Sequence, residues 1–219
     1  MSKEFETSVC AAFVADLAAR GYEAHICSFV RRTEGLRGTV WLVEGVSSLK
    51  GYFMPRLSIG VPAIGLDVAV LSRDLHQLVD PDTGARWYAW GEGSTASVAK
   101  ARADLLTEGL PWLEKHLAVD GLVQALEQER DRPRARAKKA WWRLGAPSAT
   151  DLAPPVRLNV LQFLSYAYEL QGRHAPALES WERYIAGHSR LEKGSSLEQS
   201  LTERLNVLKA RAKSSRLEG

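Results

Sequence analysis

The chain changes character just after Gln128, where a pattern of mixed helices and strands gives way to one that is helical throughout. Residues 1–129 contain 12 lysines and arginines against 17 aspartates and glutamates, a net charge of −5, whereas residues 130–219 contain 17 against 9, or +8. Opposite charge and different periodicity indicate two modules that serve interaction rather than catalysis. The sequence therefore predicts an α+β domain over residues 1–128 and a small helical domain over residues 129–219.

The first module opens with an amphipathic helix over residues 3–20, because apolar side chains recur about every four residues until Gly21 ends the pattern. Alternation with a period of two then predicts strands at residues 24–32, 39–46, 56–60, 67–71 and 86–90. Glycines at 35 and 38 predict a hairpin between the first two strands. From Thr95 the helical period returns, with a bend expected near Pro111 and a second piece starting at Gly121. We expect an antiparallel sheet flanked by N- and C-terminal helices.

The second module is read as helices alone. One helix is expected to start at Pro133, and a linker at residues 151–155 follows it. Further helices are predicted at residues 158–170 and 175–185, separated by a turn at Gly172, and a closing helix is predicted at residues 197–212.

The segment Ala103–Leu117, ADLLTEGLPWLEKHL, carries a Leu-Pro-x-Leu element made of Leu110, Pro111 and Leu113. Together with the order of helix, sheet and helix, it resembles a bacterial α+β domain family of unknown function over about residues 3–128. Similar small domains occur as immunity proteins beside bacterial toxins, so the resemblance implies a protein partner, in this case a toxin.

The helical hairpin of the second module resembles a tetratricopeptide repeat. The residues that fall on the packing positions of that repeat are Leu161, Leu164, Tyr168, Gly172, Ala177 and Trp181. Ser165 and Tyr184 depart from the small residues usual in the repeat. One repeat cannot bury both of its faces, so the hairpin is expected to pack on a neighbouring helix or on the first domain.

The sequence does not predict an enzyme, a cofactor or a metal site. The five histidines are scattered, and no nucleophile motif is present. Residues 91–94, Gly-Glu-Gly-Ser, are read as a tight turn before a helix cap rather than as a phosphate loop, because the lysine of such a loop is missing. Cys10 and Cys27 are read as two buried thiols rather than as a disulfide or metal pair.

Two sets of residues are candidates for partner binding. The basic set lies in the segment 130–143, where cations stand beside tryptophans, and comprises Arg134, Arg136, Lys138, Lys139 and Trp142. The acidic set is represented by Glu108 and Glu114 in the first domain, whose net negative charge offers a surface to a basic protein. The competing interpretation is that the basic segment is a packed helix with a solvated face and that the carboxylates are ordinary surface groups.

We expect a protein-binding module, most concretely a bacterial immunity or adaptor protein that occludes its partner without covalent chemistry. The alternative is a nucleic-acid-associated protein that uses the segment 130–143, which the modest overall charge of +3 disfavours. No apolar stretch reaches the roughly 20 residues that span a bilayer, and the N-terminus lacks the pattern of a secretory signal. A cytoplasmic location and no membrane partner are therefore expected.

Overall fold

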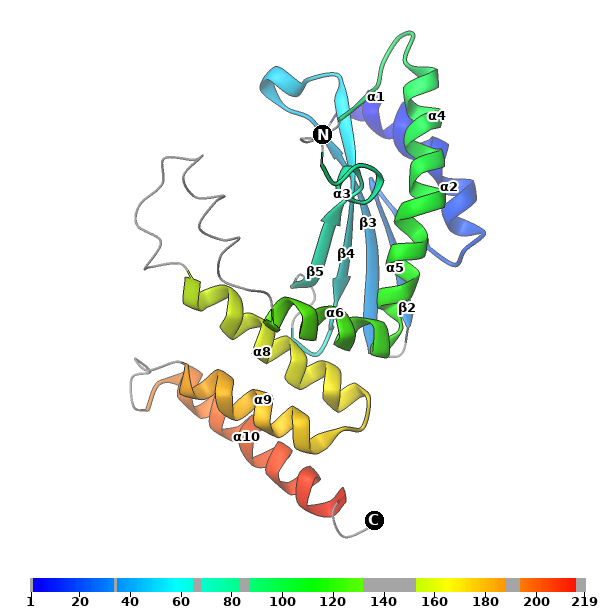
Figure 1. Ribbon diagram of the computed structural model, residues 1–219. Helices are drawn as coiled ribbons and strands as arrows, with labels where there is room; N and C mark the ends of the chain where they lie inside the picture. The colour runs from blue at the N-terminus through cyan, green and yellow to red at the C-terminus, as the bar shows by residue number, and fades with distance from the viewer. Residues whose placement is uncertain are drawn as a thin grey trace. The chain divides into compact units, whose positions relative to one another are not determined.

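The computed structural model (Figure 1) describes residues 2–33, 35–64, 68–82, 87–131, 153–187 and 194–215. It forms two compact units, Met1–Ala118 and Val119–Gly219. The first unit has an antiparallel sheet with helices and the second is helical, so the predicted α+β class is confirmed. The division falls before helix α6 (Val119–Asp131) rather than at residue 128, because α6 packs against α8 (Ala153–Leu170) of the second unit.

The sheet is an antiparallel meander in the order β1-β2-β3-β4-β5, and β6 pairs with β4 beyond the end of β5. The strands are β1 (Glu23–His25), β2 (Ser28–Thr33), β3 (Leu36–Glu44), β4 (Tyr52–Gly60), β5 (Ala69–Asp74) and β6 (Tyr88–Ala89). The segment predicted as one strand over residues 24–32 is therefore wrong, since it folds into the β1–β2 hairpin. Gly38, expected to flank a turn, lies inside β3 opposite Ile59.

One continuous helical stretch opens the chain and another closes the unit. The first comprises α1 (Lys3–Phe5), a π-helical turn η1 (Glu6–Cys10) and α2 (Ala11–Ala18); the second comprises α4 (Thr95–Asp104), a π-helical turn η3 (Leu105–Gly109) and α5 (Leu110–Leu117). The short helices η2 (Ser47–Leu49) and α3 (His76–Val79) lie in the β3–β4 and β5–β6 connections.

Both helical stretches cover the same face of the sheet. The ring of Phe53 on β4 lies 5.9 Å from Phe5 and 6.2 Å from Phe13 of the first stretch. Leu117 of the second stretch fills the space in front of Gly38 on β3. Gly38 and Phe53 share a face, because Gly38 lies two residues from Val40, whose partner Leu57 lies four residues from Phe53. Figure 1 shows α1, α2, α4 and α5 gathered on that side of the strands.

The π-helical turn η3 ends at Gly109, two residues before Pro111, the residue near which a bend was predicted. Proline has no N–H and its ring crowds the preceding turn, so the regular hydrogen-bond ladder is interrupted there and the helix locally widens. The helical stretch ends at Ala118, whose backbone is extended with ψ of 131°. The next helix consequently begins at Val119 and not at Gly121 as predicted.

Cys10 and Cys27 form a disulfide bond, with their Cα atoms 5.5 Å apart. The interpretation as two separate buried thiols is therefore wrong. It assumed that Cys27 lay within a strand, whereas Cys27 occupies the β1–β2 turn and faces the N-terminal helix at Cys10. Each cysteine is 6% exposed, so the bond lies inside the helix–sheet layer.

The second unit contains the predicted helical hairpin. Helix α8 and α9 (His174–Ala186) are joined through Gly172, whose φ of 71° suits a residue without a side chain. Residues 153–155, expected to belong to a linker, instead form the start of α8. The hairpin packs between α6 and α10 (Ser196–Ser215), and Trp181 donates to the carbonyl oxygen of Leu201 at 3.1 Å. The helix expected from Pro133 lies outside the described residues.

Removing the disulfide is expected to destabilise the protein by about 3 kcal/mol, because the bond closes a loop of 17 residues in the unfolded chain. Urea unfolding of the wild type should shift to a lower midpoint on addition of a thiol reductant. The Cys10→Ser, Cys27→Ser double variant is the control, since its midpoint should be low from the start and should not respond to reductant. Identical wild-type midpoints with and without reductant would contradict the assignment.

Candidate functional site

The predicted binding residues have different fates in the structure. Arg134, Arg136, Lys138, Lys139 and Trp142 lie outside the described residues. Glu108 lies exposed on η3 and forms no ion pair with another residue that the structure describes. Glu114 lies on α5 and is 39% exposed at its side chain.

Glu114 holds two arginines of the first unit. Its Oε1 lies 3.6 Å from Nη1 of Arg20, after α2, and 3.6 Å from Nη1 of Arg31 on β2. Arg31, Glu114, Thr33, Leu117 and Ala118 line a hollow of about 400 Å³. The carboxylate therefore joins the helical layer to the sheet, which is a structural role that competes with partner binding.

Tyr22 is buried beside this cluster. Its ring centre lies 6.0 Å from the Arg31 guanidinium carbon. Burial raises the pKa of the Tyr22 hydroxyl from 10.0 to about 12, with the nearby arginine opposing the rise. The folded protein therefore disfavours the tyrosinate form.

We expect the free energy of unfolding to fall as the pH rises from 10 to 12, because the folded protein keeps Tyr22 protonated where the unfolded chain ionises it. Below pH 10 both states bind the proton, so Tyr22 adds no slope there. The Tyr22→Phe variant should lose part of this decline. Urea unfolding of both proteins over this pH range measures the difference, and equal slopes would show that Tyr22 does not contribute.

The face of the sheet opposite the helices, here called the open face, carries a row of side chains that crosses five strands in register. The pairings of adjacent strands run His25, Ser28, Trp41, Arg56 and Asp74. These residues alternate along the strands with the helix-facing Phe29, Val40 and Leu57. Their side chains therefore point away from the helical layer. A parallel row comprises Glu23, Val30, Thr39, Ser58 and Ser72. Val30, Thr39 and Ser58 of this row are buried, so the exposed side chains of the face lie on either side of them.

Large apolar side chains gather at one end of the open face. Trp41 is 45% exposed and Tyr52 is 42% exposed. Leu49 lies over Gly45, where a Cβ atom would collide with it, and Gly45 shares a face with Val43 and with its partner Tyr52. We call Trp41, Val43, Leu49 and Tyr52 the Trp41 patch. Exposed aromatic rings grouped with aliphatic side chains are typical of interaction surfaces.

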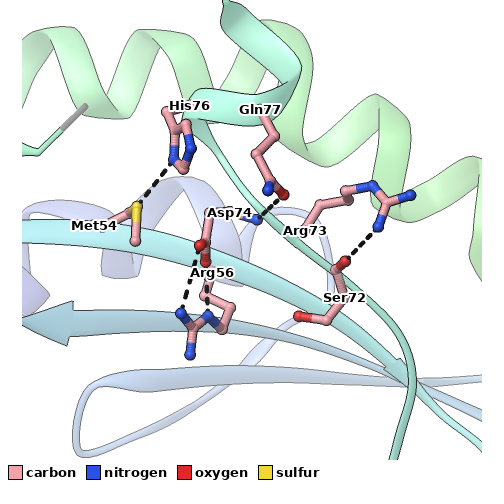
Figure 2. A network of polar contacts seen from close by, with 7 residues as sticks. All are labelled: Met54, Arg56, Ser72, Arg73, Asp74, His76 and Gln77. Atoms are coloured by element: carbon pink, nitrogen blue, oxygen red, sulfur yellow. Dashed lines mark hydrogen bonds and ion pairs between the residues drawn. The ribbon is translucent and has the colours of Figure 1, made fainter. Parts of the chain in front are cut away.

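A polar network lies beside the Trp41 patch (Figure 2). Arg56 donates through Nε to Oδ1 of Asp74 at 2.7 Å and through Nη2 to Oδ2 at 3.5 Å. The hydrogen bond that Arg56 donates to Asp74 raises the pKa of the Arg56 guanidinium, so the guanidinium stays charged. The side chain of Arg56 remains 46% exposed and presents this charge next to Trp41.

The same network covers the outer edge of β5. The backbone N–H of Asp74 donates to Oε1 of Gln77 at 3.1 Å, and Nη1 of Arg73 donates to the carbonyl oxygen of Ser72 at 3.0 Å. Leu75 N–H bonds Pro55 on β4, so the alternate residues 72 and 74 direct their backbone groups away from the sheet. Side chains thus satisfy edge groups that would otherwise pair with another strand.

Replacing both covering residues, as Arg73→Ala with Gln77→Ala, should expose the β5 edge and promote self-association. Light scattering coupled to size-exclusion chromatography measures the effect as a concentration-dependent rise in mass. The matched control, Arg183→Ala with Gln128→Ala on the helices of the second unit, should stay unchanged. Equal behaviour of the two double variants would show that the covering contacts do not protect the edge.

Sequence reasoning did not single out Trp41 or Arg56. The signal was present in residues 39–46, where Trp41 and Val43 alternate with Val40 and Leu42. Both alternating sets are apolar, so the pattern alone does not say which set faces the core. The register that brings Arg56 and Asp74 beside Trp41 depends on strand pairing between residues distant in sequence.

Comparison with protein-family models, with curated proteins and with solved structures finds no match to this chain. Across the part of the chain that the structure describes, no group of three or more His, Cys, Asp or Glu residues is placed to hold a metal ion. The described helices include none with the length and apolar character needed to cross a membrane.

Proposed function

We infer that this protein acts by binding another protein through the open face of its first unit, as an immunity or adaptor protein that occludes a site on its partner. Binding of this kind needs no covalent chemistry, so the proposal assigns no enzymatic activity. The observation that carries it is the Trp41 patch, in which Trp41 and Tyr52 stay almost half exposed beside the arginine of the Arg56–Asp74 pair.

The composition of this surface supports a protein partner. Tryptophan, tyrosine and arginine are the residues most often found to dominate binding energy in protein interfaces. A rigid antiparallel sheet holds their side chains at fixed spacing, which lowers the entropy lost on binding. The bacterial domain family that Ala103–Leu117 resembles, and the immunity proteins among similar domains, agree with this proposal.

A cytoplasmic location is part of this proposal. The Cys10–Cys27 disulfide weighs against it, because thiol reductants keep most cytoplasmic cysteines reduced. The redox state of these two cysteines in cells of the source organism distinguishes the cytoplasm, where they should be reduced, from an oxidising compartment, where the disulfide should persist.

Affinity capture of the tagged full chain from a lysate of its source tests the function. We expect one protein at near-equal amount that survives nuclease treatment and is lost with the Trp41→Ala, Tyr52→Ala double variant. The matched control is Leu197→Ala with Val207→Ala, which removes exposed apolar side chains from α10 and should retain the partner. Loss of all co-purifying protein after nuclease would favour the nucleic-acid alternative, and retention by the Trp41 variant would overturn the assigned surface.

A further inference from the structure

We propose that the open face binds an acidic protein segment, whose apolar side chain packs on the Trp41 patch and whose carboxylate meets Arg37. This rests on the proposed protein-binding function and adds the chemistry of the partner. It differs from the sequence-based expectation that the first domain, with its net negative charge, meets a basic protein.

The arginines of the open face outnumber its carboxylates. The two carboxylates in register on this face are already engaged, since Glu23 lies 2.6 Å from Arg32 and Asp74 lies 2.7 Å from Arg56. Arg37 pairs with Arg32 across β2 and β3 and so lies on the same face. Arg37 forms no ion pair with any residue in the described ranges.

The position of Arg37 suits it for a ligand. Its backbone partner on β4 is Gly60, and a Cβ atom placed on Gly60 would lie 3.7 Å from Nε of Arg37 and 3.8 Å from its Nη2. The guanidinium therefore lies over Gly60, where the backbone oxygen of Val68 also lies, 3.2 Å from the same Cβ position. At the other end of the face, Lys50 is exposed in the β3–β4 connection next to Leu49. Cations thus stand at both ends of the open face.

The exposed carboxylates of the described first unit lie mainly on other elements. Glu4, Glu6 and Glu108 are exposed on the helical stretches, and Glu92 is exposed in the loop before α4. The acidic excess of the first half of the sequence is therefore not a property of the open face. Electrostatic complementarity at this face favours an acidic partner and disfavours a basic one.

A protein segment fits these observations better than a single nucleic-acid strand. Nucleic acids bind along continuous tracks of cations that neutralise successive phosphates. On the open face, two of the three arginines are already neutralised by Glu23 and Asp74. Val43 and Leu49 add aliphatic surface beside Trp41, and a sugar–phosphate backbone has no apolar groups that would cover it.

The test is selection of binders to the full chain from a displayed library of random peptides. We expect the selected peptides to combine glutamate or aspartate with a large apolar residue and to compete for the Trp41 surface. Their synthetic versions should bind Arg37→Glu and Trp41→Ala at least tenfold more weakly than the wild type. Lys209→Glu, which makes the same charge change on α10, is the matched control and should bind like the wild type.

Two additional measurements keep the outcomes separable. Arg37→Gln removes the charge without introducing a carboxylate, so a smaller loss of affinity is expected even if Arg37→Glu folds poorly. Replacing the acidic residues of a selected peptide by lysine should restore binding to Arg37→Glu. Titration of oligothymidine into the ¹⁵N-labelled protein tests nucleic acid at the same backbone amides.

Selected peptides that depend on Trp41 but are basic, or that ignore Arg37, would overturn the acidic partner while leaving protein binding at this face intact. Selection of no Trp41-dependent peptide, or amide shifts at the open face with oligothymidine alone, would overturn the inference. A different result would contradict the proposed function itself, namely that no protein captured from the lysate by the wild type is lost with the Trp41→Ala, Tyr52→Ala double variant.

Discussion

The packing of Phe53 is the contact on which the first unit depends. This residue is fully buried near the start of β4, and its ring lies 5.9 Å from Phe5, 6.2 Å from Phe13 and 5.8 Å from Tyr88. Three segments that are distant in sequence thus meet at one side chain. Docking the N-terminal helix on this ring brings Cys10 against the β1–β2 turn, and it brings Ser2 to Glu44, whose two carboxylate oxygens each accept a hydrogen bond of 2.8 Å.

The same packing explains why the opposite face remains available. Along the strands, apolar side chains at alternate positions pack against the helical layer. The positions between them carry Ser28, Trp41, Arg56 and Asp74. The sheet is covered by helices on this one side, and Trp41 and the side chain of Arg56 remain almost half exposed on the other, where Ser28 is buried. The surface that we assign to binding is therefore a direct result of how the core is built.

The sequence predicts the class of this fold and most helices, because their apolar period is long and ends at clear signals such as Gly21 and Gly172. It fails where a short segment is ambiguous. Residues 24–32 have the period of one strand, yet a two-residue turn at Ile26 and Cys27 divides them, and the disulfide was missed for the same reason. The boundary between units was placed too late because α6 continues the helical pattern that precedes it.

The candidate site was less accessible to prediction than the fold. The acidic charge of the first domain suggested Glu108 and Glu114 as binding residues. A count of charges cannot show, however, that Glu114 already forms ion pairs with Arg20 and Arg31 within the same unit. The open face is composed of single residues from five strands, so no local motif marks it. The pairing of the strands is needed to place Arg32 beside Glu23 and Arg56 beside Asp74, and the sequence alone does not give this pairing.

The outer edge of β5 is covered by side chains, so the sheet is poorly suited to bind another strand through its backbone. At the β5 edge of the sheet, the side chains of Arg73 and Gln77 bond two backbone groups. The opposite edge is formed by β1, which has only three residues. The sheet therefore has few free backbone groups with which an incoming strand can pair. Under the proposed function, the partner contacts side chains that contribute nothing to the hydrogen bonds between strands. Changes to the side chains of the Trp41 patch would then alter which partner is bound, while the backbone pairing of the sheet stays the same.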